Sequence, residues 1–247
     1  MKKLVIFGVF VVVLCLSTAS TMADMTFGTT ELQSNLDSIT EGGVSSIDIT
    51  QDYIDDDRDS YWEITASGGS FTTLVFEATG WANTNTFGVF DSANPNTFVQ
   101  LFNGAQAPGE QATLSIKTGG HVWVNLVDTG IVFTGNAFGY YLDSSDSDNR
   151  SSGRFYSDTQ YNSDQVDHMA AYQGNDLDVL GLPGLEPGVW TSNEYILAFE
   201  DTLNGGNFDY NDFVVMVESV HPVPVPGAIL LGMLGMSAAG LRLRRFA

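Results

Sequence analysis

Cysteine is almost absent from this 247-residue chain. Its single copy, Cys15, lies in an N-terminal segment where the basic start Met1–Lys3 is followed by an apolar run over 4–16 and small polar residues up to Ala23. This order is typical of a secretory signal peptide, and the run is short for a membrane span. We therefore predict that residues 1–23 export the chain and are cleaved off, which leaves no cysteine for a disulfide. An uncleaved N-terminal anchor is the alternative.

Basic side chains are also scarce. Residues 24–226 hold all thirty acidic residues but only four basic ones, which gives this segment a formal net charge of −26. Such a charge argues against nucleic acid and anionic membranes as partners, and it favours solubility and the uptake of cations. The four basic residues are Arg58, Lys117, Arg150 and Arg154.

Residue patterns for catalysis are missing as well. The histidines His121, His168 and His221 are far apart, and no nucleophile elbow, zinc-binding helix motif or phosphate-binding glycine loop occurs. Carboxylates are so numerous that no glycosidase pair stands out. We therefore predict a protein that is not an enzyme.

The body of the chain lacks sustained helical periodicity, and its apolar stretches have the length of strands. Glycine, asparagine and proline punctuate these stretches, which favours an all-β fold, an antiparallel β-sandwich of jelly-roll type. One short helix is predicted at Thr30–Leu36. The predicted strands are Ser60–Ala66, Phe71–Thr79, Thr86–Asp91, Phe98–Phe102, Gln111–Lys117, His121–Asp128, Ala137–Leu142, Gln165–Tyr172, Glu194–Asp201 and Asp212–Val220.

A polar, acidic segment at Asp143–Gly153 is the strongest candidate for a domain boundary. Strand-like segments continue on both sides at the same spacing, so a solvated loop is favoured over a linker between two domains. We predict an exported β-sandwich body over residues 24–222.

Two predicted strands flank a loop that is rich in oxygen-bearing side chains. Gly205 and Gly206 supply a turn, and several loop oxygens are spaced so that they can aim at one point. A hard cation such as Ca²⁺ takes about 6–8 oxygen ligands in irregular geometry. The alternative is that Asp and Asn only stabilise a turn through hydrogen bonds to their own backbone. The candidate ligands are Glu200, Asp201, Asn207, Asp209, Asn211 and Asp212, with Asp209 and Asp212 the strongest.

The same stretch carries a family resemblance. Phe199-Glu-Asp201, Gly205-Gly206 and Asp209-Tyr-Asn-Asp-Phe-Val-Val215 resemble the C-terminal signature of domain of unknown function 4114, which is found in exported bacterial proteins. The family pattern has an aspartate and an arginine where this chain has Asn207-Phe208, so one formal charge of a cation site is missing. The resemblance covers Gln165–Val220 and implies no enzymatic activity.

The C-terminus carries a second targeting pattern. A proline-rich segment precedes an apolar run over 227–241, and three arginines follow almost at the end. This order resembles a PEP-CTERM sorting signal, with Pro-Val-Pro in place of the usual Pro-Glu-Pro. The resemblance implies an exosortase-type processing enzyme as a partner and a single membrane helix in the tail 223–247; a plain membrane anchor is the alternative. The predicted signal comprises Val223, Pro224, Val225, Pro226, Arg242, Arg244 and Arg245.

Aromatic side chains suggest a different ligand, because β-sandwiches with exposed rings can stack sugars. Trp81 and Trp190 stand beside turn residues and are predicted to be exposed, whereas Trp123 alternates with apolar neighbours and is predicted to be buried. The other stacking candidates are Trp62 and Tyr140-Tyr141.

A second acidic cluster, Asp55–Asp59, could also bind a cation. We predict that its side chains stay apart in solvent instead, because crowded like charges repel one another.

Two functions of different classes remain. The first is a non-catalytic protein of the cell envelope or extracellular matrix, exported to the cell surface or beyond, membrane-tethered before its tail is processed, and stiffened by calcium. The alternative is a carbohydrate-binding module acting on extracellular polysaccharide.

Overall fold

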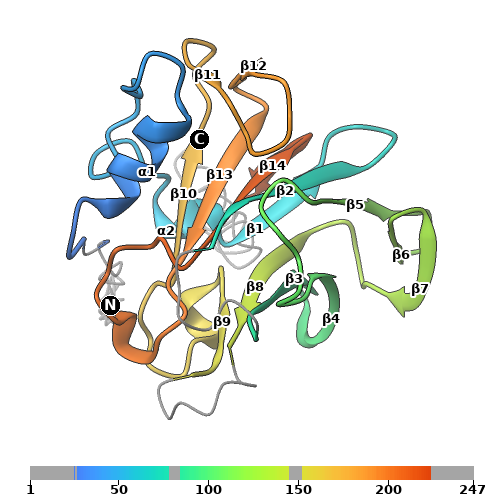
Figure 1. The fold of residues 1–247 in the computed structure, drawn as a ribbon. Helices are drawn as coiled ribbons and strands as arrows, with labels where there is room; N and C mark the ends of the chain where they lie inside the picture. The colour runs from blue at the N-terminus through green and yellow to red at the C-terminus, as the bar shows by residue number, and fades with distance from the viewer. Residues whose placement is uncertain (1–24, 26, 78–83, 145–151, 224–247) are drawn as a thin grey trace, which may run out of the picture.

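The computed structural model describes residues 25, 27–77, 84–144 and 152–223, and these fold mostly into antiparallel β-sheets (Figure 1). The prediction of an all-β, antiparallel sandwich is confirmed, while its jelly-roll connectivity stays a prediction. The predicted signal peptide and, apart from Val223, the predicted sorting tail lie outside the described residues. Within the described ranges, no helix has the length and apolar character that a membrane crossing requires.

The larger layer is a seven-stranded sheet. Its strand order is β10 (Met169–Gln173), β13 (Glu194–Phe199), β14 (Phe213–Glu218), β2 (Ser70–Phe76), β5 (Gln111–Ile116), β6 (His121–Val124) and β7 (Val127–Val132). The β13–β14 pair runs in register from Glu194 opposite Glu218 to Phe199 opposite Phe213.

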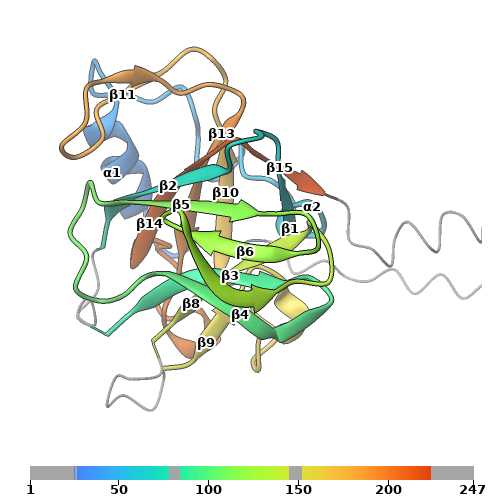
Figure 2. The same cartoon turned by 90° about the vertical axis from the view of Figure 1, so that its right-hand side faces the viewer.

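The second layer is a six-stranded sheet. Its strand order is β15 (Val220–Val223), β1 (Tyr61–Ile64), β8 (Phe138–Asp143), β3 (Thr86–Asp91) and β4 (Asn94–Phe102), with β9 (Arg154–Tyr156) also paired to β8. The chain passes from β14 in one layer to β15 in the other through Ser219, which has a φ of 59°. Figure 2 shows β3, β4 and β8 below β5 and β6 of the larger sheet.

The main core lies between the two layers, because alternate side chains of each strand point inward. On β13, Leu197 and Phe199 face this core, and Trp62 and Phe87 meet them from the other sheet. The rings of Phe87 and Phe199 are 5.7 Å apart between centroids and meet edge to face. This packing fixes the end of β13 from which the candidate site begins.

Helix α1 (Glu31–Ile39) covers the opposite face of the seven-stranded sheet (Figure 1). Leu32 and Leu36, one turn apart, belong to a second apolar cluster that includes Ile196 and Val214. Both faces of β13 and β14 are therefore buried. The helix predicted at Thr30–Leu36 is confirmed and continues to Ile39.

Several local features differ from the prediction. The segment predicted as one strand at His121–Asp128 is split by a tight turn at Asn125 and Leu126, whose φ angles of 50° and 65° suit a two-residue hairpin. The other elements without a counterpart in the prediction are α2 (Asp56–Asp59), β9, β11 (Val179–Leu180), β12 (Gly188–Val189), β15, η1 (Thr159–Tyr161) and η2 (Leu203–Gly205).

The acidic cluster Asp55–Asp59 is only partly in solvent. Asp55 and Asp57 are exposed, as predicted, but Asp59 is 1 % exposed, so the prediction is wrong for this residue. The reason is the helical turn of α2, which points Asp59 away from the side of Asp57 and into the protein.

The segment Asp143–Gly153 joins neighbouring strands of one sheet. Residues 145–151 lie outside the described part, but β8 and β9 on either side of them pair with each other. At the base of the connection, the Arg154 guanidinium forms an ion pair of 2.6 Å with the Asp143 carboxylate. The segment thus has the position expected of a loop within one sheet.

Candidate metal centre

The candidate site lies in the loop between the end of β13 and the start of β14, at the lower left of Figure 1. Because Phe199 pairs with Phe213, the next residues outward, Glu200 and Asp212, emerge side by side. Asp209 comes from the loop that joins the two strands. One carboxylate oxygen of Glu200, one of Asp209 and one of Asp212 lie within 4.8 Å of one another.

The loop reaches this arrangement through a strained backbone. Phe208 and Tyr210 have φ angles of 56° and 50°, a conformation that costs a residue with a side chain on the order of 1 kcal/mol or more. Gly206, with a φ of 48°, lets the chain pass so close to Glu200 that a Cβ atom would stand 2.2 Å from Glu200 Oε1. Strain of this kind is found at ligand-binding loops, where the surroundings hold it in place.

Amide groups hold two of the three carboxylates. The backbone N–H of Asp201 donates to Asp212 Oδ2 at 2.9 Å, and Asn207 Nδ2 donates to Asp209 Oδ2 at 2.5 Å. Glu200 differs from both, because it is 1 % exposed and its Oε2 accepts no hydrogen bond from an amide or hydroxyl group of the described residues. Its side chain is hydrogen-bonded to the Asp212 carboxyl group instead. Two buried carboxyl groups in contact can both be charged only at a high cost in free energy, so a cation that binds both of them would stabilise the site.

His168 holds the backbone of this site in place. The His168 Nδ1 atom lies 3.0 Å from the Glu200 carbonyl oxygen, and its Nε2 atom lies 3.0 Å from Asp164 Oδ2. Asp164 in turn accepts a hydrogen bond of 2.6 Å from the backbone N–H of Asn204, in the loop. These contacts tie both ends of the site to the segment that precedes β10.

The electrostatics disfavour three separate negative charges. Burial, reinforced by Asp212, raises the pKa of Glu200 to about 9. Burial and then Asp201 raise the pKa of Asp212 to about 7. Burial also raises the pKa of Asp209. Carboxylates that crowd in this way hold on to protons unless a positive charge joins them.

No Lys or Arg in the described part is paired with the three carboxylates. A hard divalent cation would supply the missing charge, because the converging oxygens are the ligands that Ca²⁺ prefers and the loop imposes no regular geometry. Zinc fits less well, since its usual nitrogen and sulfur ligands are not among these three residues. The ion pairs found in the described part join Arg58 to Asp55, Arg154 to Asp143 and His168 to Asp164.

The six predicted ligands divide into two groups. The structure brings Glu200, Asp209 and Asp212 together and gives the other three supporting positions. Asp201 accepts from Asn85 Nδ2 at 2.9 Å. Asn207 directs its amide group at Asp209, and Asn211 donates its amide hydrogen to Glu31 Oε2 at 3.0 Å. Calcium itself stays a prediction.

Sequence reasoning missed the residues that arrive from distant segments. Glu77 follows β2, and burial, followed by Asp201 and Asp212, raises its pKa to about 8. Asn85 is fully buried, and its side-chain oxygen has no hydrogen-bond partner among the described residues. No local motif marks either residue; only the pairing of β2 with β14 brings Glu77 near the loop.

The comparison with known families agrees with the resemblance found in the sequence. Residues 129–220 match the family described as Domain of unknown function (DUF4114). The match begins in β7, well before the predicted Gln165, and it includes the β13–β14 pair with all three converging carboxylates. No curated protein and no solved structure matches the chain. The match applies to this part of the chain and names no ligand.

The described residues predicted to stack sugars are buried, apart from the half-buried Trp123. Trp190 is fully buried and donates its Nε1 hydrogen to the Glu194 carbonyl oxygen at 3.2 Å, so the prediction of an exposed Trp190 is wrong. It is covered because it packs in the cluster beneath α1. Trp81 lies outside the described residues. The remaining candidates Trp62, Tyr140 and Tyr141 are also buried.

Trp123 was predicted to be buried, but it is only half-buried. The Lys117 Nζ atom lies 5.8 Å from its ring centroid, a cation–π contact at the edge of the larger sheet.

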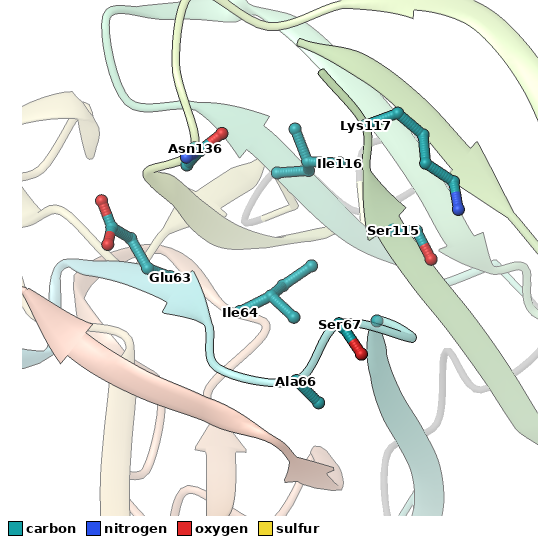
Figure 3. Close-up of a pocket in the computed structure, with 9 residues that line it drawn as sticks. Glu63, Ile64, Ala66, Ser67, Ser115, Ile116, Lys117 and Asn136 are labelled. Carbon is teal, nitrogen blue, oxygen red and sulfur yellow. The ribbon is translucent and has the colours of Figure 1, made fainter.

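A separate hollow of about 190 Å³ lies between the end of β1 and β5 (Figure 3). Glu63, Ser67 and Lys117 give it polar walls, and Ile64 and Ile116 line its apolar part. This volume is below the range of about 300–1,000 Å³ that is usual for ligand pockets, and no aromatic ring lines it. It offers no stacking platform for a sugar.

Proposed function

We propose that this is a non-catalytic, exported protein of the cell envelope or extracellular matrix, whose DUF4114 domain binds Ca²⁺ between Glu200, Asp209 and Asp212. The observation that carries the proposal is that one oxygen from each of these three carboxylates lies within 4.8 Å of the other two. A divalent cation would replace the protons that the crowded groups otherwise retain.

The place of action is proposed from the sequence. A signal peptide at 1–23 would export the body, and the tail 223–247 would hold it in the membrane until an exosortase-type enzyme processes it. Extracellular calcium-binding modules have a Kd of about 10⁻⁴–10⁻³ M. A site of moderate affinity, preorganised by strained loop residues, is sufficient for a structural role there.

A melting experiment tests the calcium site. Calcium should raise the Tm of the protein more than magnesium does at equal ionic strength, because Mg²⁺ demands a stricter octahedral geometry. The gain is about 2.7 kcal/mol at a hundredfold excess of calcium over Kd. Asp209→Ala should lose much of this gain, and Glu186→Gln, a change to an exposed carboxylate, should keep it. Equal calcium-dependent shifts in wild type and Asp209→Ala would show that the loop is only a turn.

A further inference from the structure

A second pair of buried carboxylates lies outside the Glu200 centre. Asp59, the last residue of α2, is 1 % exposed, and Asp167, two residues before β10, is 4 % exposed. Neither oxygen of Asp59 has a hydrogen-bond partner among the described residues, and neither does Asp167 Oδ2. Only Asp167 Oδ1 is satisfied, by the backbone N–H of Met169 at 3.1 Å. Three buried carboxylate oxygens are thus without a donor.

The charged groups that act on this pair are acidic. Burial, then Asp167 and Asp56, hold the pKa of Asp59 well above its usual value. Burial and Asp56 do the same to the pKa of Asp167. Asp56 is partly satisfied, because its Oδ1 accepts from Thr159 Oγ1 at 2.9 Å. The electrostatic potential at Asp59 and Asp167 is therefore negative and favours binding of a cation.

The positively charged candidates nearest in sequence are engaged elsewhere. Arg58, on α2 itself, is turned outward to Asp55, with 3.8 Å between its Nη1 and Asp55 Oδ2. The His168 ring is stacked on Phe155 at 4.0 Å and bonded at both nitrogens to other oxygens. Neither side chain neutralises Asp59 or Asp167.

The backbone behind both carboxylates is anchored. Trp62 Nε1 donates to the Asp59 carbonyl oxygen at 2.6 Å. The Tyr210 hydroxyl donates to the Asp167 carbonyl oxygen at 3.0 Å. Tyr210 belongs to the loop of the Glu200 centre, so it links the backbone of that loop to the second carboxylate pair.

Protons alone do not satisfy this pair. A carboxylate left charged and alone in the interior costs several kcal/mol, and a protonated one needs an acceptor for its hydrogen. A proton shared by Asp59 and Asp167 would bring their oxygens into a short hydrogen bond, whereas Asp167 acts on Asp59 through its charge and not through a hydrogen bond. The two segments lie side by side, because the Ile54 backbone N–H donates to the Ala171 carbonyl oxygen at 2.8 Å, so a cation bound by both side chains would supply the missing positive charge.

We propose that Asp59 and Asp167 hold a second divalent cation, separate from the Glu200 centre, with Asp56 at its rim. Oxygen ligands and two negative charges suit Ca²⁺. Within the described residues, only Glu200, Asp209 and Asp212 form a group of three carboxylates within 4.8 Å, so the further ligands of the second ion are backbone carbonyls or water. The argument for this site does not depend on the proposed function.

The test counts bound ions. The full-length protein is stripped with a chelator and dialysed against ⁴⁵Ca²⁺ at physiological ionic strength with excess Mg²⁺, which suppresses loose binding to the acidic surface. Wild type should bind two calcium ions per chain, Asp59→Asn one and Glu200→Gln one. The control Asp57→Asn removes an exposed charge from the same helix and should keep two.

Stability provides a second readout. In calcium-free buffer, Asp59→Asn should have a higher Tm than wild type, because it removes a buried carboxyl group that folding forces to take up a proton. In calcium the order should reverse. Asp167→Asn should behave as Asp59→Asn does, which covers the case where one variant folds poorly. If Asp59→Asn and Asp167→Asn each still bind two calcium ions per chain, the second site is overturned. If wild type binds one ion and Glu200→Gln binds none, the second site would also be overturned. If wild type binds one ion and only Asp59→Asn fails to bind it, the proposed Glu200 centre would be overturned instead.

Discussion

Replacing Glu200 with glutamine should make the calcium-free protein less sensitive to pH. The pKa of this buried carboxyl is raised from 4.5 to about 9, so the folded protein keeps a proton that the unfolded chain releases. Its contribution to the free energy of unfolding is therefore fully present below about pH 4.5 and is lost as the pH rises toward 9. Glu200→Gln removes this titration and should be more stable than wild type at pH 8.

The size of the effect follows from proton linkage. A difference of one bound proton changes the free energy of unfolding by about 1.4 kcal/mol per pH unit. Since Asp212 shares the proton and solvent reaches the loop, we expect roughly half of this. Wild type should then lose about 1–2 kcal/mol more than Glu200→Gln between pH 5 and pH 7.

Urea unfolding at pH 5, 6 and 7 with a chelator measures this difference. Glu77 also has a raised pKa and contributes in the same direction in both proteins, so only the difference between them reports on Glu200. The exposed control Glu186→Gln should follow wild type. Saturating calcium should reduce the difference in pH dependence, because the ion displaces the proton. Parallel pH profiles of wild type and Glu200→Gln without calcium would refute the reasoning.

Three further predictions concern the loop and the tail. Gly206→Ala should lower the calcium affinity measured by calorimetry at least tenfold, because the added Cβ atom would displace Glu200 Oε1. The control Gly184→Ala should change this affinity little, since Gly184 also has a positive φ but no atom lies within 4 Å of its added Cβ. Tyr210→Phe should weaken ion binding at Asp167 more than at Glu200, since it removes the hydroxyl bonded to the Asp167 carbonyl; equal weakening in dialysis would contradict the assignment. Deleting residues 227–247 should release the body from the membrane fraction, and unchanged fractionation on immunoblots would show that the tail does not place the protein.

Local patterns were sufficient to predict much of the fold. Apolar stretches of strand length predicted β13 and β14, and they are nearly continuous because both faces of these strands are buried, one against the other sheet and one under α1. The turn at Asn125-Leu126 was missed because neither glycine nor proline marks it, although both residues adopt positive φ. Short strands such as β11 and β12 carry too few residues to show a period.

The candidate site was predictable only where it is local. Glu200, Asp209 and Asp212 lie within one hairpin and its loop, so their proximity follows from sequence spacing. Glu77 and Asn85 reach the site through tertiary structure, which no motif reveals. Trp190 was misjudged because neighbouring turn residues suggested exposure, whereas the cluster under α1 covers its ring.

A crystal structure of the full-length protein grown in millimolar calcium tests the central claim most directly. We expect an ion with oxygens of Glu200, Asp209 and Asp212 at about 2.3–2.6 Å, the usual Ca²⁺–oxygen distance. Anomalous scattering would identify the ion. Density that shows these three carboxylates bonded only to one another and to amide groups, with calcium present in the crystal, would contradict the account.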